Sequence, residues 1–248
     1  MDTSTLLIDG DIVLYKVSWA CQKEIDYGDV ITYTSSLEEL KVTFDADIRN
    51  LVKASGCEDY KVVISSSSNF RKKLFKEYKA NRLGTRKPLG YKKLQQYCLD
   101  MQPCLLVKEG LEADDVLGIV MTSLDNCMTA SIDKDMLTIP GKHYNIDKGT
   151  IADISLKEAD HNFYVQILTG DTCDNYKGCP GVGAVTAERL LKNCESHEDY
   201  WEVIVGAFKK AGLNEADALI QARMARILRK EDYDFEKDEV KLWLPITQ

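Results

Sequence analysis

The sequence lacks the features that mark membrane-spanning and zinc-binding proteins. It has no apolar run near the ~20 residues that cross a bilayer, so we expect no membrane segment. Its three histidines have no metal-binding spacing, and its eight cysteines form no Cys-x-x-Cys pair. Since these cysteines are scattered through predicted strands and helices, we expect free buried thiols and neither disulfides nor a zinc site.

Proline is also scarce, with only 5 residues in a chain of 248. Hydrophobic residues make up 44% of the chain and charged residues 29%, which is an ordinary globular composition. A chain of this length buries one full core, so one large domain or one and a half is the natural expectation.

Outside one segment, negative charges outnumber positive ones. The chain has a net charge of −8, but residues 71–93 contain ten Lys or Arg residues and one Glu, a net +9 that leaves −17 on the remainder. A basic strip on an acidic body attracts a phosphate backbone to one place and repels it elsewhere. The alternative, a solvated helix face, normally interleaves charges of both signs, which this strip does not.

Short apolar segments alternate with helical patterns along the first two thirds of the chain. The expected buried strands lie within residues 5–11, 60–65, 104–110 and 127–135, and expected helices include 37–51 and 111–120. Residues 143–155 predict a hairpin around Lys148–Gly149, and only helical patterns occur from residue 156 onward. The alternation predicts an α/β fold with a mostly parallel central sheet and flanking helices. We expect an α/β core at 1–165 and a helical region at 166–248.

Acidic residues recur where the predicted strands end. In open parallel sheets this edge is where ligands bind. Each pair also has a structural explanation, as helix caps or first-turn residues. Together, however, carboxylates that converge on one edge would repel one another unless cations were bound between them. The residues are Asp9 and Asp11, then Glu112, Asp114 and Asp115, then Asp133 and Asp135, and finally Asp171 and Asp174.

Divalent cations suit such a cluster. Mg²⁺ or Mn²⁺ takes oxygen ligands, keeps several waters and needs only one or two carboxylates directly. Two ions about 4 Å apart can activate a water and stabilise the leaving oxygen of a phosphodiester. Since no Ser-His-Asp arrangement is apparent, we expect metal-dependent hydrolysis without a covalent intermediate.

A glycine-rich turn follows the last acidic pair. Gly178, Gly181 and Gly183 lead into a predicted helix, and such a turn lets backbone N–H groups approach a phosphate closely. The alternative is that the turn simply joins two helices. Beside a metal cluster, a phosphate-binding turn predicts one substrate that meets both, a nucleic acid strand.

The motifs as a set resemble the 5′-nuclease family, which includes flap endonucleases, the 5′-exonuclease domain of DNA polymerase I and stand-alone phage 5′→3′ exonucleases. The matching stretches are LIDGD, FRKKLFKEYKANR, LEADDVLG, SIDKDMLT and LTGDTCDNYKGCPGVGAVTA. They occur in family order within residues 6–187, and the chain length is most similar to the compact phage enzymes. The resemblance implies a PIN-like nuclease core, a basic arch at about 66–95 and a DNA-gripping helix–three-turn–helix at about 168–195.

The resemblance also implies roles for individual residues. All the acidic residues above except Asp11 would hold two Mg²⁺ or Mn²⁺ ions, some through water, with Asp9 and Asp133 central to catalysis. Lys79 and Arg82 would contact the scissile phosphate. Tyr78 would either stack on a terminal base or pack within the arch. The residues expected to bind DNA are Arg71, Lys72, Lys73, Tyr78, Lys79, Arg82, Gly181 and Gly183, the last two beside a K⁺ site.

One departure from the family pattern concerns the strand before the arch. Many relatives carry an Asp there, as in FDGK, whereas this sequence has ISSSSNFR, with Ser65 or Ser66 near that place. We hypothesise that Asp11, next to Asp9, supplies the missing carboxylate; the alternative is a strand-end cap.

These patterns predict a 5′→3′ exonuclease that acts on DNA at duplex ends, nicks or 5′ flaps. They leave flap endonuclease activity, RNase H-like activity on RNA–DNA hybrids and processivity open. We expect a monomer in the cytoplasm, encoded by a phage. Two alternatives are a DNA-binding module with weak catalysis and an aspartate-nucleophile phosphatase, since Asp9–Val13 fits the DxDx[TV] signature.

Overall fold

A six-stranded sheet, in the order β5-β4-β1-β6-β7-β8, forms the centre of the protein. The computed structural model describes residues 4–100 and 104–245. The strands of the sheet are β1 (Thr5–Asp9), β4 (Asp59–Val63), β5 (Leu105–Leu106), β6 (Cys127–Ser131), β7 (Gly141–Asn145) and β8 (Thr150–Ile154). All neighbouring strands are parallel except β7 and β8. The predicted mostly parallel sheet is confirmed.

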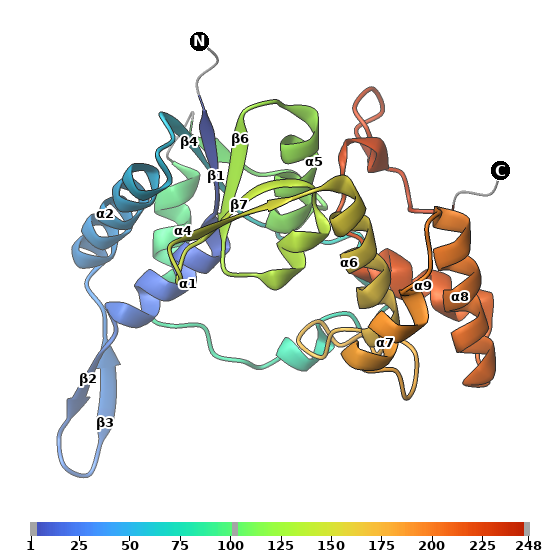
Figure 1. Cartoon of the computed structure of the whole chain (residues 1–248). Helices are drawn as coiled ribbons and strands as arrows, with labels where there is room; N and C mark the ends of the chain where they lie inside the picture. Colours follow the sequence, from blue (N-terminus) through green and yellow to red (C-terminus); the bar gives the residue numbers. More distant parts are fainter. Residues whose placement is uncertain (1–3, 101–103, 246–248) are drawn as a thin grey trace.

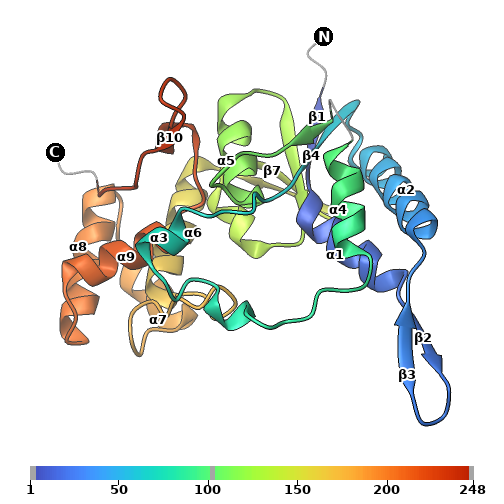
Figure 2. The same cartoon turned by 180° about the vertical axis from the view of Figure 1, so that it is seen from behind.

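Helices cover both faces of this sheet (Figures 1 and 2). On one face lie α1 (Gly10–Ala20), α2 (Leu37–Ser55) and α4 (Tyr91–Leu99), and on the other lies α5 (Ala113–Ser123). The alternation of side chains along β1 explains the two cores. Leu6 and Ile8 are buried against the first group of helices, whereas Leu7 is buried on the α5 face.

The remaining helices build a third core beside the sheet (Figure 1). They are α6 (Leu156–Thr169), α7 (Ala184–Leu191), α8 (His197–Lys210) and α9 (Glu215–Ala225). Phe163, Ile204 and Phe208 are fully buried among them. The helical C-terminal portion is therefore present. Its predicted boundary at residue 165 stays a prediction, and α6 begins before it.

The segment predicted to form the arch joins the helical portion to the sheet. Its short helix α3 (Arg71–Leu74) contacts α9, and a 3₁₀ turn η1 (Ala80–Arg82) follows. Residues 83–90 then run without helix or strand to α4, so that the segment crosses from one part of the molecule to the other (Figures 1 and 2).

Several local features differ from the expectations. Asp11 lies in the first turn of α1 and not at a strand end, because Asp9 caps that helix by accepting the Ile12 N–H at 3.3 Å. Two hairpins were not predicted: β2–β3 (Lys23–Asp26 and Ile31–Thr34), which projects from the body, and β9–β10 (Tyr233–Asp234 and Glu239–Val240), where only helices were expected. Further 3₁₀ turns are η2 (Lys134–Thr138) and η3 (Lys230–Asp232).

Other expectations agree with the structure. The hairpin predicted at 143–155 is confirmed as β7 and β8. All eight cysteines are free thiols, but the prediction that they are buried is wrong for Cys173, which is exposed. Within residues 4–100 and 104–245, no helix combines the length and the apolarity needed to span a membrane.

Gly118 in α5 and Gly206 in α8 form a matched pair for testing how tightly the helices pack. A Cβ on Gly118 would lie 2.3 Å from the backbone oxygen of Leu228, whereas one on Gly206 would meet nothing within 4 Å. We expect Gly118→Ala to lower the free energy of unfolding by about 1–3 kcal/mol and Gly206→Ala to raise it by about 0.5–1 kcal/mol. Urea unfolding followed by circular dichroism measures both, and similar effects of the two substitutions would contradict this packing.

Candidate active site

A cavity of about 190 Å³ opens at the carboxyl ends of β1, β4 and β6. Parallel strands bring their carboxyl ends to the same edge, so residues far apart in the sequence meet there. The predicted metal-binding residues that line the cavity are Asp9, Asp11, Glu112, Asp114, Asp133, Asp135 and Asp174. Asp115 and Asp171 are outside this lining.

A chain of hydrogen bonds orients the acidic groups at the ends of β1 and β6. The Ser131 hydroxyl donates to Asp9 Oδ2 at 2.8 Å and accepts the Asp133 N–H at 3.1 Å. Asp133 Oδ1 in turn accepts the Asp135 N–H at 2.8 Å and so caps η2. The sequence analysis missed Ser131, whose only signal was a polar side chain at the end of a buried strand.

These carboxylates are buried close together and repel one another. Burial, followed by the charges of Asp11 and Asp133, raises the pKa of Asp9 to about 7. Burial and the neighbouring Asp133 likewise raise the pKa of Asp135 to about 7. The pKa of Asp114 is raised well above its ordinary value by burial and by Asp9 and Asp133. Such groups are stabilised by binding either protons or a cation.

The residues of this cavity fit a divalent cation. Among the described residues, no three Asp, Glu, His or Cys side chains are arranged to enclose an ion by themselves. Mg²⁺ and Mn²⁺ do not need such a cage, because they keep several waters and bind one or two carboxylates directly. The oxygen donors and the raised pKa values of Asp9 and Asp135 match that requirement.

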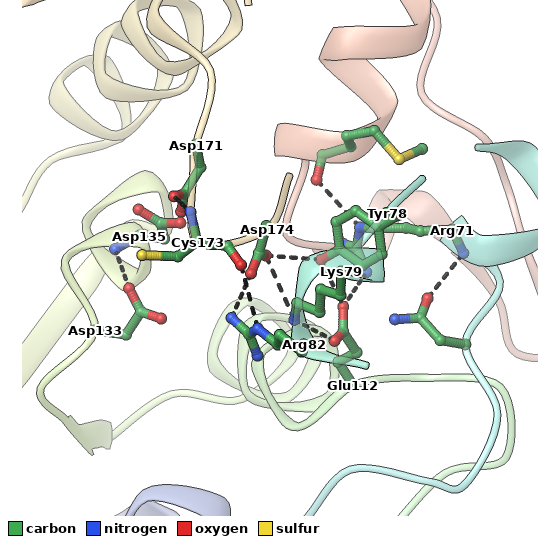
Figure 3. Close-up of polar contacts among 12 residues, drawn as sticks. Arg71, Tyr78, Lys79, Arg82, Glu112, Asp133, Asp135, Asp171, Cys173 and Asp174 are labelled. Carbon is green, nitrogen blue, oxygen red and sulfur yellow. Dashed lines mark hydrogen bonds and ion pairs between the residues drawn. The ribbon is translucent and has the colours of Figure 1, made fainter. Parts of the chain in front are cut away.

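A second group of acidic residues is paired with side chains of the arch segment (Figure 3). Lys79 Nζ bonds to Glu112 and lies 3.4 Å from Asp174 Oδ2. Arg82 Nη2 lies 2.6 Å from Asp174 Oδ1. The Tyr78 hydroxyl donates to Glu112 at 2.8 Å and to Asp174 at 2.9 Å. The predicted metal ligands Glu112 and Asp174 are thus neutralised by the residues predicted to contact the phosphate.

Backbone contacts fasten the arch segment to the loop after α6. The Lys79 N–H donates to the Asp174 carbonyl at 2.8 Å, and the Asn175 amide donates to the Glu77 carbonyl at 2.7 Å. Lys79 has φ of 55°, a left-handed conformation that is uncommon outside glycine.

The ion pairs of Glu112 also set its pKa. Although burial alone would raise the pKa of Glu112, Lys79 and Arg71 hold it at about 2.

The structure decides between the two roles suggested for Tyr78. Its side chain is 3% exposed, and its hydroxyl is occupied by the two carboxylates. Tyr78 therefore packs within the arch, and the predicted stacking of its ring on a DNA base is wrong for this arrangement. Lys72 and Lys73 are exposed on α3, so their contact with DNA stays a prediction.

Asp115 and Arg71 also differ from their predicted roles. Asp115 is fully buried and forms a two-pronged ion pair with Arg71, at 2.7 and 2.6 Å. Arg71 is 3% exposed and also donates to the backbone oxygens of Met224 and Arg226. In this structure Asp115 therefore faces Arg71 and lies outside the cavity lining, and Arg71 is buried away from the surface. Their pairing joins the arch segment to α5 and to the residues after α9.

The loop between α6 and α7 carries the remaining predicted residues. Asp171 lies beside Asp135 in Figure 3, and its metal-binding role stays a prediction. Gly181 has φ of +77°, and a Cβ at Gly181 or Gly183 would meet nothing within 4 Å. The backbone is therefore open to an approaching ligand here, which leaves phosphate binding as a prediction.

Ser65, which with Ser66 is near the place where the resemblance implies an acidic residue, contacts Asp11. The Ser65 N–H donates to Asp11 Oδ2 at 3.1 Å, and the Ser65 hydroxyl accepts the Ala113 N–H at 2.9 Å. The Asp11 carboxylate is thereby drawn toward the end of β4 and lines the cavity with Asp9. This placement is the one that a substitute carboxylate would need.

A sequence model of the 5′-3′ exonuclease N-terminal resolvase-like domain matches residues 4–161. The chain belongs to the 5′-3′ exonuclease family. The exonuclease of Escherichia phage T7 is 27% identical, over 98% of this chain and 94% of that protein. The exodeoxyribonuclease of Enterobacteria phage T3 is 26% identical over the same shares, 98% and 94%.

The fold has a counterpart among solved structures. The T5 D15 protein, co-crystallised with metal ions, superimposes with a TM-score of 0.65 at 14% identity, over 90% of this chain and 88% of that one. The resemblance to the 5′-nuclease family and the predicted fold class are confirmed. Membership of this family excludes the phosphatase alternative.

Replacing Asp115 tests whether this residue is structural. Asp115→Asn removes the charge that faces the buried Arg71 guanidinium, so we expect the free energy of unfolding to fall by about 3 kcal/mol. The Mn²⁺ affinity of the folded protein should not change, because Asp115 lies outside the cavity lining. Denaturant unfolding and calorimetric titration measure the two quantities, with Asp153→Asn on the exposed face of β8 as the control. A loss of Mn²⁺ affinity at unchanged stability would show that Asp115 is a ligand after all.

Proposed function

We propose that this member of the 5′-3′ exonuclease family hydrolyses DNA phosphodiesters from 5′ ends with two Mg²⁺ or Mn²⁺ ions. The observation that carries the proposal is the gathering of seven predicted acidic ligands around one cavity, with Lys79 and Arg82 at its rim. Relatives from phages T7 and T3 are exonucleases. The T5 D15 flap endonuclease has been crystallised with DNA and metal ions, which supports the same substrate and ions here.

Different acidic residues are proposed to hold each of the two ions. Asp9, Asp114 and Asp133 would hold one ion, with Asp11 beside them, since burial and the charges of Asp9 and Asp133 raise the pKa of Asp114. Asp135, near Asp133 and Asp171, would hold the other. When bound, such ions activate a water and stabilise the leaving oxygen of a phosphodiester.

Lys79 and Arg82 would act on the phosphate itself. Both are fixed at the cavity by Glu112 and Asp174, whose charges they balance. A phosphate in the cavity offers these cations a further acceptor. They would then stabilise the negative charge that develops on its oxygens.

The DNA backbone is proposed to lie between the exposed lysines of the arch and the α6–α7 loop. In this proposal the positive charge comes from Lys72 and Lys73. The loop backbone at Gly181 and Gly183 is open to a phosphate, and a K⁺ ion would bind beside it. We propose duplex ends, nicks and 5′ flaps as substrates, RNA–DNA hybrids as a further one, and a monomer as the active form. The phage origin of the relatives supports the cytoplasm of a bacterial host as the location.

A 5′-labelled duplex with Mg²⁺ tests this function and the role of Lys79 together. The protein should release nucleotides from the 5′ end, whereas a pure DNA-binding module would shift the duplex and release none. Lys79→Ala should slow single-turnover cleavage by about 10²-fold, because a cation that stabilises the transition state is lost. Lys53→Ala, on the exposed end of α2, is the control. A Lys79→Ala variant with only a binding defect would refute its catalytic role.

A charge-neutral substitution of the same size tests whether Asp11 supplies the missing carboxylate. Asp11→Asn should lower Mg²⁺-dependent turnover roughly 10–100-fold, and higher Mg²⁺ should restore part of it, since the ion loses a charged partner. Asp125→Asn makes the same change at the opposite end of β6 and should have no effect. Near-normal kinetics of Asp11→Asn would mean that Asp11 is only a first-turn residue of α1.

A further inference from the structure

Gln166 is a residue of the cavity to which no role has yet been assigned. It lies on α6 and lines the cavity together with the acidic residues. Its side-chain oxygen, Oε1, is buried and has no hydrogen-bond partner among the described residues. An acceptor buried without a donor is destabilising, and native proteins rarely keep one without a reason.

The neighbours of Gln166 fix the orientation of its amide group. The side chain of Gln166 faces Asp135 as a donor, and a carboxylate can only accept from the NH₂ end of an amide. The carbonyl end therefore points away from Asp135. The charged side chains nearest to Asp135 besides Lys134 are Asp133 and Asp171, which as carboxylates are acceptors as well. Since no described residue donates to this oxygen, a molecule that enters the cavity can supply the donor.

We propose that Gln166 is a positioning residue for the ion held by Asp135. Its NH₂ group orients the Asp135 carboxylate, and its carbonyl oxygen accepts a hydrogen bond from a water bound to the ion. This inference rests on the proposed metal-dependent function, and it adds a residue of α6 to a site otherwise built from carboxylates. Oriented partners of this kind set metal affinity in many proteins.

Asn162, one helical turn before Gln166, shows what a purely structural amide does at this place. Its amide donates to the Leu137 carbonyl at 2.8 Å and so attaches α6 to η2, the 3₁₀ turn that carries Asp135. Two amides of the same helix thus face the same turn. The amide of Asn162 is bonded to backbone, whereas the carbonyl of Gln166 has no partner.

Mn²⁺ binding to the full-length protein, followed by electron paramagnetic resonance and calorimetry, tests the role of Gln166. We expect the wild type to bind two ions and Gln166→Leu to weaken one of them about 10–100-fold. The melting temperature without metal should not fall, because the substitution removes an unsatisfied acceptor. Gln166→Glu loses the NH₂ group that orients Asp135 but keeps an acceptor oxygen, so it should weaken that ion less than Gln166→Leu does. Asn162→Leu should leave the Mn²⁺ affinity unchanged and lower the melting temperature.

Three results would overturn the inference. One is a Gln166→Leu variant that binds both ions normally. Another is a Gln166→Leu variant whose metal-free melting temperature falls together with Mn²⁺ binding, as for a merely structural residue, with Gln166→Glu equally defective. A wild type that binds no Mn²⁺ would instead refute the proposed function, and the inference with it.

Discussion

The repulsion among carboxylates brought to one edge of the sheet is the constraint on which this structure depends. The sheet topology forces the ends of β1 and β6 together, and the residues that follow β4 and β5 join them. Part of the resulting negative charge, on Glu112 and Asp174, is balanced within the chain by Arg71, Lys79 and Arg82. The charge centred on Asp9 and Asp135 has no such balance, and burial together with the neighbouring carboxylates raises the pKa values of both groups. The divalent cations proposed for this site would relieve that imbalance.

The arch segment has a structural task besides its expected contact with DNA. Through Arg71 it connects α5 to the carbonyl groups at the end of α9, and through Lys79 and Asn175 it is attached to the α6–α7 loop. The helical portion and the sheet are thereby held at a fixed distance across the cavity. The basic strip in the sequence is therefore divided between one buried structural arginine, catalytic candidates at the rim and exposed lysines.

Sequence patterns predicted the sheet, most of its helices and the set of residues around the cavity, because strand-end carboxylates and apolar alternation are local signals. They did not predict the projecting β2–β3 hairpin, whose residues are exposed and follow no burial pattern. Nor did they predict Ser131 and Gln166, which are single polar residues within apolar segments. For Asp115 the sequence patterns instead predicted a role in the cavity that the structure does not show. Its motif is that of a metal ligand, but its side chain points into the interior toward Arg71.

The sequence by itself determined the family and the α/β fold class and predicted the chemistry of the site, because these depend on residue types and on their order along the chain. Only the tertiary structure decided which acidic residues share the cavity and which are paired with cations. The physical reason is that adjacent residues on a helix, such as Asp114 and Asp115, point in different directions. One faces the cavity and the other the core, so their surroundings give identical side chains different roles.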